Sequence, residues 1–131
     1  MINFDADPPR RGEVYWADLT PARGSEQDGH RPVLVVSLDS FNRQMRTVVT
    51  AAMTSQVKPS VREGRSPVAV FIPKGPQGME KDGAVLCFQI TTLARERLED
   101  YICQLTPEQM RDVDRAMAAS FGLAEWTGRA L

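Results

Sequence analysis

Short blocks of apolar residues, separated by polar loops, run along most of the chain and predict β-strands. The block Pro32 to Leu38 (PVLVVSL) is nearly all apolar and β-branched, so we expect a strand buried on both faces. Blocks rich in Val, Ile, Thr and aromatic residues are also typical of strands. They predict further strands over residues 13–19, 47–54, 68–72, 84–90 and 100–105.

The pattern changes to a helical period near the C-terminus. Thr106 is a typical N-cap residue, Pro107 suits the first helical position, and Gln109 completes a capping box. Apolar side chains then recur at helical spacing, at Met110, Val113, Met117 and Phe121, before Gly122. The segment therefore predicts a helix of about fifteen residues that packs on the sheet through its apolar face.

Two short helices and two long loops complete the expected order. Residues 40–44 and 93–98 are predicted to form short helical segments. The polar segments 20–30 and 55–66 are predicted to be loops. Long loops without regular structure are often functional, so these two are candidates for a binding site.

Composition is that of an ordinary globular protein. With 131 residues, 42% of them hydrophobic and 25% charged, the chain can bury one core, and we expect a single domain over residues 1–131. Residues 1–10 are predicted to be a flexible lead-in and residues 124–131 a tail. The apolar blocks are too short to span a bilayer, and residues 1–11 lack the apolar stretch of a secretory signal. We therefore expect a cytoplasmic protein without membrane association.

Residue types that bind metals are scarce. Cys87 and Cys103 lack CxxC spacing and lie among apolar residues, so reduced and buried thiols are expected. His30 is the one histidine in the chain, which is too few for a zinc site built from His and Cys. No metal and no cofactor are predicted.

The formal net charge of −1 hides an uneven distribution. Residues 1–39 and 82–131 are each acidic, whereas residues 40–81 carry seven basic side chains against two acidic ones. A solvated loop face and a local phosphate-binding surface are both consistent with such a segment. The seven are Arg43, Arg46, Lys58, Arg62, Arg65, Lys74 and Lys81.

The motifs of several common enzyme classes, such as GxSxG, HExxH and phosphate-binding glycine loops, are absent. Arg31 lies directly before the buried strand that begins at Pro32, and Thr54 ends the strand 47–54. If these two strands are neighbours, as consecutive strands usually are, one surface groove would hold both side chains. The alternatives are a surface salt bridge for Arg31 and an ordinary strand residue for Thr54.

The same residues fall in blocks that resemble a known family. Arg11 to Leu19 (RGEVYWADL) is similar to the opening of the MazF/PemK toxins. Gly24 to Gln27 (GSEQ), followed by Gly29 to Ser37 (GHRPVLVVS), is similar to their central signature. Thr50 to Ser55 and Gln89-Ile90 also match in kind and order. The combination of blocks at this spacing is specific, whereas any one of them alone would not be.

Over about residues 10–122, the resemblance implies an α+β fold: a small SH3-like, CcdB–MazF-type antiparallel β-barrel with short helices and a C-terminal helix. Members of this family are toxins of bacterial toxin–antitoxin systems and work as homodimers. They are metal-independent endoribonucleases that cut single-stranded RNA, chiefly mRNA, at short sequences. The implied partners are RNA, a cognate MazE-like antitoxin and a second copy of the chain.

The resemblance also implies the residues of the site. Arg31 and Thr54 match the catalytic pair, which promotes attack of a 2′-OH on the adjacent phosphate and leaves a 2′,3′-cyclic phosphate. A guanidinium can stabilise the charge on the phosphorane with two parallel hydrogen bonds, and a hydroxyl can add another. The implied RNA-binding residues are Ser25, Glu26, Gln27, His30, Ser55 and Gln89.

The general base has open alternatives. Arginine is effectively always protonated, which makes Arg31 a poor base. His30 has a more suitable side chain for proton transfer, and Glu26 is a second candidate. The other interpretations are a histidine at the edge of the groove and a carboxylate that positions RNA. Two departures from the family pattern, Phe88 and the segment 94–98 (ARERL), stand where many members carry an acidic residue and bear on the cut sequence.

Two other functions remain open at this point. CcdB toxins share this fold and poison DNA gyrase without enzymatic activity, through a C-terminal segment that contains tryptophan. Trp126-Thr127-Gly128 is superficially similar to that segment. A catalytically inactive relative that only binds RNA or a partner is the other alternative, although the presence of both Arg31 and Thr54 argues against it.

Overall fold

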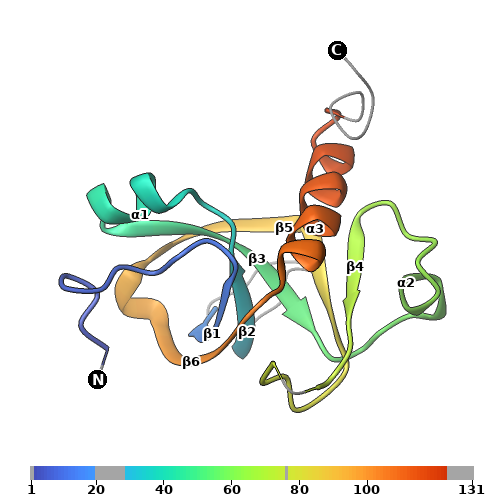
Figure 1. Ribbon diagram of the computed structural model, residues 1–131, viewed down its shortest axis with the longest axis horizontal. Coiled ribbons are helices and arrows are strands. Elements are labelled where there is room, and N and C mark those ends of the chain that lie inside the picture. The colour runs from blue at the N-terminus through green and yellow to red at the C-terminus, as the bar shows by residue number, and fades with distance from the viewer. Residues whose placement is uncertain (1, 20–28, 76, 124–131) are drawn as a thin grey trace.

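The computed structural model describes residues 2–19, 29–75 and 77–123, and these form a curled six-stranded sheet with short helices around it (Figure 1). The strands lie in the order β4-β5-β3-β2-β1-β6, and every neighbouring pair is antiparallel. Along the chain the elements are β1 (Glu13–Asp18), β2 (His30–Val35), α1 (Asp39–Gln44), β3 (Thr47–Thr54), α2 (Pro59–Arg62), β4 (Ala69–Ile72), β5 (Gly83–Ala94), the 3-10 helix η1 (Arg95–Arg97), β6 (Leu98–Gln104) and α3 (Pro107–Ser120). The predicted α+β fold with an antiparallel sheet and a C-terminal helix is confirmed.

The predicted strands are all present, with some changes at their ends. The strand expected over 32–38 begins earlier, at His30, and ends at Val35, because the chain then turns toward α1. The strand expected over 84–90 continues to Ala94. One expectation was wrong: the predicted loop 55–66 contains the short helix α2, which has Pro59 in its first turn, where proline needs no hydrogen-bond donor.

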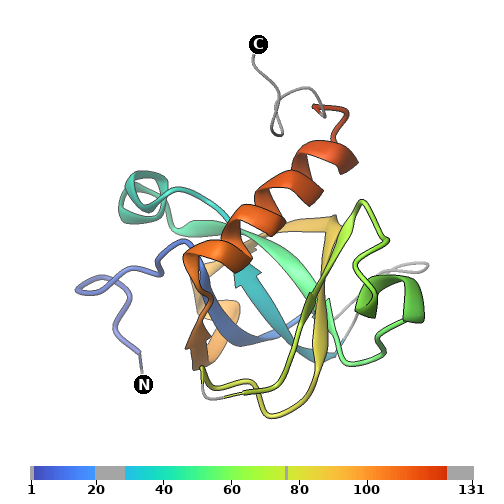
Figure 2. The same cartoon turned by 45° about the vertical axis from the view of Figure 1, so that its right-hand side comes forward.

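Helix α3 covers one face of the curled sheet (Figure 2). Its predicted capping box is confirmed: the Thr106 hydroxyl accepts from the Gln109 amide at 3.1 Å, and the Gln109 side chain accepts from the Thr106 amide at 2.9 Å. The core beneath the helix contains Cys87 and Cys103, both free and buried as predicted. Burial raises the pKa of the Cys87 thiol to about 12, which keeps this thiol protonated at neutral pH.

A second apolar cluster fills the opposite side of the central strands. Successive side chains of a strand point to opposite faces, so Val14 enters the cluster under α3 while Tyr15 enters the second one. In β2, Leu34 and its neighbour Val33 are divided in the same way, and both are fully buried. The sequence-based expectation of a strand buried on both faces is therefore confirmed for β2.

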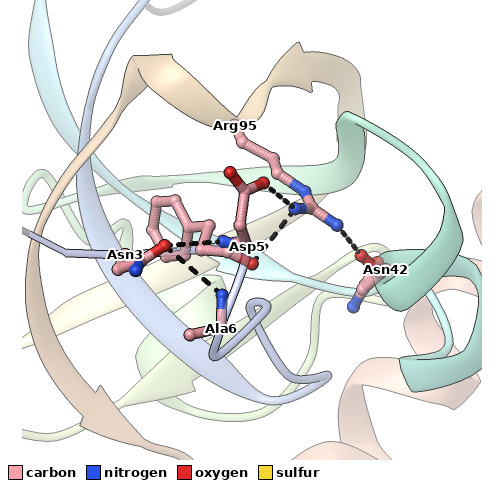
Figure 3. Close-up of polar contacts among 6 residues, drawn as sticks. Asn3, Asp5, Ala6, Asn42 and Arg95 are labelled. Atoms are coloured by element: carbon pink, nitrogen blue, oxygen red, sulfur yellow. Dashed lines mark hydrogen bonds and ion pairs between the residues drawn. The ribbon is translucent and has the colours of Figure 1, made fainter.

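The N-terminal segment is attached to the sheet through Arg95 of η1, which connects β5 to β6 (Figure 3). The Arg95 side chain is 9% exposed, donates to the Phe4 carbonyl at 3.1 Å, and also donates to the Asn42 carbonyl of α1. It forms an ion pair with Asp5 at 3.7 Å. One buried guanidinium thus joins three segments that are distant in sequence: the N-terminal segment, α1 and η1.

Ring packing makes a second attachment of the N-terminal segment. The Phe4 ring meets the Tyr15 ring edge-on, with 5.7 Å between the centroids. Burial is the main reason that the pKa of Tyr15 is raised, and its hydrogen bond to Glu13 adds to this. The segment 2–10, for which the sequence predicts flexibility, therefore packs against the second apolar cluster.

Candidate functional site

A cavity of about 470 Å³ opens at the end of the sheet where β2 begins and β3 ends. Its lining comes from β1, β2, β3, β6, the start of β5 and the connection between β4 and β5, so nearly the whole sheet contributes. The lining residues are Trp16, His30, Arg31, Pro32, Met53, Thr54, Ser55, Gly78, Met79, Glu80, Lys81, Asp82, Gly83, Asp100, Tyr101 and Ile102.

Curling of the sheet brings the β4–β5 connection against β6, and this closes one wall of the cavity. Gly78, in that connection, has a φ of +124°, a conformation that residues with a side chain rarely adopt. A Cβ atom at this position would lie 2.7 Å from the Ile102 carbonyl oxygen of β6. Glycine is therefore required here on two grounds, and it allows opposite edges of the sheet to approach.

Arg31 and Thr54 come together in this cavity, as the sequence predicts if their strands are neighbours. Strands β2 and β3 pair antiparallel, with Val33 opposite Ala52. Continuing this register by two residues places Arg31 opposite Thr54, and both side chains line the cavity. The regular pairing stops at Val33, next to Pro32, which has no N–H to donate to a ladder.

His30 and Ser55 extend the polar lining on either side of that pair. His30 begins β2, and its Nδ1 atom lies 2.7 Å from a carboxylate oxygen of Glu99 in β6. Ser55 is exposed, and the Thr54 hydroxyl accepts a hydrogen bond from the Gln56 amide at 3.1 Å. Four of the site residues named from the sequence therefore share one cavity.

Sequence reasoning missed the acidic part of this lining. Glu80, Asp82 and Asp100 stand among the cationic groups Arg31 and Lys81. A hydrogen bond from the Lys74 amide at 2.9 Å and another from Arg62 at 2.9 Å lower the pKa of Asp82, so this carboxyl stays ionised. Asp82 therefore anchors the cavity wall and is unsuited to donate a proton.

Two exposed aromatic side chains of the cavity were also missed. Trp16 is 41% exposed and Tyr101 is 50% exposed, so both rings have surface that a ligand in the cavity can contact. The Tyr101 ring packs edge-on against Tyr15, with 5.6 Å between centroids. The two-residue alternation of β1 could have identified Trp16, because a buried Tyr15 turns its neighbour to the other face.

Other predicted site residues do not reach the cavity or lie outside the described residues. Ser25, Glu26 and Gln27 belong to the segment 20–28, outside the described ranges. Gln89 is half-buried in β5 and is not part of the lining. The pairing of β5 with β3 explains this. Ala51 pairs with Ile90, but the next residue, Ala52, pairs with Leu86, so Gln89 lies in a stretch of β5 without regular partners in β3.

The basic segment 40–81 does not form one phosphate-binding surface. Arg43 belongs to α1 and Arg62 to α2, and these helices lie at opposite ends of the sheet (Figure 1). Arg62 is paired with Asp82 and lies over the Phe71 ring at 4.7 Å. Of the seven basic residues in this segment, Lys81 lines the cavity.

Within 2–19, 29–75 and 77–123, no group of three or more His, Cys, Asp or Glu side chains is placed to hold a metal ion. None of the helices in those segments has the length and hydropathy of a bilayer-spanning helix. The lining itself contains an arginine, hydroxyls, a histidine and exposed aromatic rings, features that suit a phosphate-containing polymer.

Comparison with known proteins agrees with this class of site. A family model described as PemK-like, MazF-like toxin of type II toxin–antitoxin systems matches residues 10–121. The endoribonuclease MazF of Staphylococcus saprophyticus is 39% identical over 114 residues, which span 87% of this chain and 92% of that protein.

Solved structures show the same fold. An endoribonuclease from a mycobacterial species, solved in complex with its cognate antitoxin, has a TM-score of 0.71 and 31% identity, over 88% of this chain and 96% of that one. MazF from Deinococcus radiodurans has a TM-score of 0.73 and 25% identity, over 88% of this chain and 97% of that one. The chain belongs to the PemK/MazF family of toxins from type II toxin–antitoxin systems. The predicted family and the CcdB–MazF-type fold are thereby confirmed.

Proposed function

We propose that this protein is an endoribonuclease toxin that cuts single-stranded RNA, chiefly mRNA, at selected short sequences in the cytoplasm, and so inhibits translation and growth. Family membership and the 39% identical endoribonuclease MazF support this function. The observation that carries it is the presence of Arg31 and Thr54 in one cavity, side by side in the extended register of β2 and β3.

The reaction that suits these groups is transfer of the phosphate to the neighbouring 2′-oxygen. The 2′-oxygen forms a bond to phosphorus, the bond to the 5′-oxygen breaks, and the products carry a 2′,3′-cyclic phosphate and a 5′-hydroxyl. Negative charge grows on the two non-bridging oxygens in the phosphorane. The Arg31 guanidinium can donate to both of them, and the Thr54 hydroxyl can add a third hydrogen bond. This chemistry requires alignment and charge stabilisation, and it calls on no metal.

RNA binding would use the rest of the cavity and its surroundings. The exposed rings of Trp16 and Tyr101 offer faces on which unpaired bases can stack. The remaining substrate-binding residues in this proposal are Ser25, Glu26, Gln27, His30, Ser55 and Gln89, with Ser55 and His30 in the lining itself.

The proposed protein partners are a cognate MazE-like antitoxin and a second copy of this chain. The mycobacterial relative was solved with its cognate antitoxin, which supports an antitoxin for this chain as well. A twofold homodimer would use the same patch on both subunits. An acidic antitoxin segment that folds over the cavity would compete with RNA for Arg31 and Lys81, so both complexes should weaken as salt rises.

The test is digestion of a mixed set of long RNAs by purified protein in the presence of a chelator. We expect cuts at a short recurring sequence, with cyclic phosphate at the 3′ ends of the upstream fragments. Mapping the 5′ ends of the downstream fragments then gives the sequence. An R31A variant prepared in parallel controls for contaminating nucleases. Failure of wild-type protein to cut any of these RNAs would contradict the proposal.

The gyrase-binding alternative is not favoured, because the family model and the curated relative are both of the MazF type. The short sequence similarity that suggested this alternative, at Trp126-Thr127-Gly128, lies outside the described residues. Deletion of residues 124–131 separates the two functions, since it should abolish gyrase binding and leave RNA cleavage intact.

A further inference from the structure

A short polar contact at the edge of the cavity joins two strands that are not neighbours in the sheet. His30 lies in β2 and Glu99 in β6, with β1 between them. The Nδ1 atom of His30 and a carboxylate oxygen of Glu99 are 2.7 Å apart, although the residues are 69 positions apart in sequence. His30 also lines the cavity beside Arg31. The curled sheet therefore fixes an imidazole, at one ring nitrogen, next to the cationic group of the proposed site.

This contact determines which ring nitrogen is left to react. A carboxylate accepts hydrogen bonds, so the Nδ1 atom that faces Glu99 carries the proton in the neutral ring. The other nitrogen, Nε2, then holds the lone pair and can accept a proton. When it does, the imidazolium that forms is stabilised by the carboxylate on its opposite side, as in other catalytic carboxylate–histidine pairs.

Two charged groups of the described lining, Arg31 and Asp82, are less suited to accept a proton. Arginine remains protonated, so Arg31 cannot act as a base. Asp82 is held ionised by the Lys74 amide and Arg62, which lower its pKa and make its carboxylate a weak base. Among the described residues, the charged groups that face His30 or share its cavity are Asp18 of β1, opposite it in register, Glu99 of β6, and Arg31, Glu80, Lys81, Asp82 and Asp100 around the lining.

We propose that His30 is a catalytic residue that takes the proton of the attacking 2′-hydroxyl, and that Glu99 is the positioning residue that fixes its ring. The inference rests on the proposed endoribonuclease function. The proton moves from the 2′-oxygen to Nε2 as the bond from the 2′-oxygen to phosphorus forms. The bond from phosphorus to the 5′-oxygen breaks with its electron pair on oxygen, water protonates that oxygen, and His30 returns its proton to solvent. Glu99 gains no proton in this sequence.

The first test is single-turnover cleavage of an RNA that the wild-type protein is shown to cut, measured from about pH 5 to 9. General base catalysis typically contributes about 10²–10⁴-fold, so H30Q should slow cleavage by that factor and abolish the fall in rate at acidic pH. E99Q should slow it by about tenfold and shift that acidic limb, because glutamine accepts from Nδ1 but stabilises the imidazolium less. The double variant should be no slower than H30Q, since the two residues act as a unit.

Controls separate this role from a structural one. E96Q removes an exposed carboxylate of η1 that is outside the cavity and should leave rate and pH profile unchanged. Thermal unfolding should be similar in wild type, H30Q and E99Q. Because His30 is also a proposed RNA-binding residue, single-turnover rates are compared at saturating protein, where a change in RNA affinity does not affect the rate. If wild-type protein cuts RNA and H30Q cuts it equally fast with the same pH profile, the proposed roles of His30 and Glu99 are wrong, whereas the proposed endoribonuclease function stands. A wild-type protein that cuts no RNA would overturn the proposed function and the pair with it.

A second substrate distinguishes a base from an acid. An RNA with sulfur in place of the 5′-bridging oxygen at the cut needs no proton on its leaving group. We expect H30Q to remain slow on this RNA, because deprotonation of the 2′-hydroxyl is still required. Restoration of the wild-type rate by the sulfur substrate would assign proton donation to His30 and overturn its role as the base.

Discussion

Arg31 and Arg95 are the same residue type in two regions of one sheet, and their surroundings differ in kind. Arg95 is buried at the far end, where it donates to the carbonyls of Phe4 and Asn42 and joins the N-terminal segment to α1 (Figure 3). Arg31 is half-buried and lines an open cavity of about 470 Å³ together with Thr54.

In the proposed function, this difference separates an arginine that holds the fold together from one that acts on the RNA phosphate. At Arg95 the protein's own backbone carbonyls take the place that phosphate oxygens would occupy, so the guanidinium is committed to structure. At Arg31 the cavity leaves room for an RNA phosphate, and hydroxyls stand beside it. The lesson is that accessible space and neighbouring groups, more than residue type, decide the role of a cation.

The largest expected effect follows from substitution of Arg31. R31A should lower the rate constant of RNA cleavage by about 10²–10³-fold or more, which corresponds to about 3–4 kcal/mol of lost transition-state stabilisation. R31K should remain strongly impaired, because an ammonium group lacks the planar fork that binds two phosphate oxygens. Single-turnover cleavage of a defined RNA measures both effects.

The matched control for R31A is R43A, at an exposed position on α1 and outside the cavity lining. R43A should cut RNA at the wild-type rate, and R31A should retain the wild-type thermal unfolding midpoint within a few degrees. Equal activity of R31A and wild type would contradict a role of Arg31 in RNA cleavage.

Substitution of Arg95 should act on stability instead. R95M leaves the carbonyls of Phe4 and Asn42 without their charged donor, so the free energy of unfolding should fall by about 2–3 kcal/mol. Cleavage per folded molecule should stay near the wild-type value, because Arg95 is outside the cavity lining. Urea unfolding, with activity measured on the folded protein, checks both expectations.

R111M, at an exposed position of α3, is the control for the loss of an arginine and should change stability by less than about 0.5 kcal/mol. If R95M is as stable as R111M, the hydrogen bonds of Arg95 do not hold the N-terminal segment in place. A loss of cleavage in folded R95M would show instead that the two regions are coupled.

The sequence predicted the sheet well because its strands are marked by local patterns. The block at 32–38 is apolar enough to require burial on both faces, and the capping box at Thr106 fixes the start of α3. The short helix α2 was missed, because a single turn in a polar, basic segment leaves no apolar period to detect. Its position depends on tertiary contacts, such as Val61 in a third apolar cluster with Ala69.

The site was predictable in part. Arg31 and Thr54 could be placed together, since consecutive strands usually pair. The contributions of Asp100 and Tyr101 to the lining, and the contact of Glu99 with His30, could not, because β6 meets the cavity only through the curl of the sheet and the close approach at Gly78. The local pattern around Arg95 also resembles an ordinary charged turn, and nothing in it reveals the contacts with residues near the N-terminus.

A smaller effect is expected at the cap of α3, which belongs to the structural region. T106A removes the hydroxyl that accepts from the Gln109 amide and should destabilise the protein by about 1 kcal/mol. T106S keeps that oxygen and should remain close to wild type. Cleavage by the folded T106A variant should not change, because the cap is outside the cavity lining. Urea unfolding of the three proteins tests the prediction, and equal stability of T106A and T106S would contradict it.

The smallest effect is expected at Asp82. This residue lines the cavity, and its carboxylate also has a structural role because it holds the cavity wall in place. The Lys74 amide and Arg62 lower the pKa of this carboxyl in the folded protein, so its ionised form favours folding. This stabilisation is present above the ordinary carboxyl pKa of about 4 and is lost as the pH falls through the lowered folded-state value. D82N should therefore be slightly less stable than wild type at neutral pH, and the two should converge in acid. Thermal unfolding from about pH 7 down to about pH 2 follows the difference, and a gap between the two proteins that is independent of pH would show that the charge of Asp82 contributes nothing.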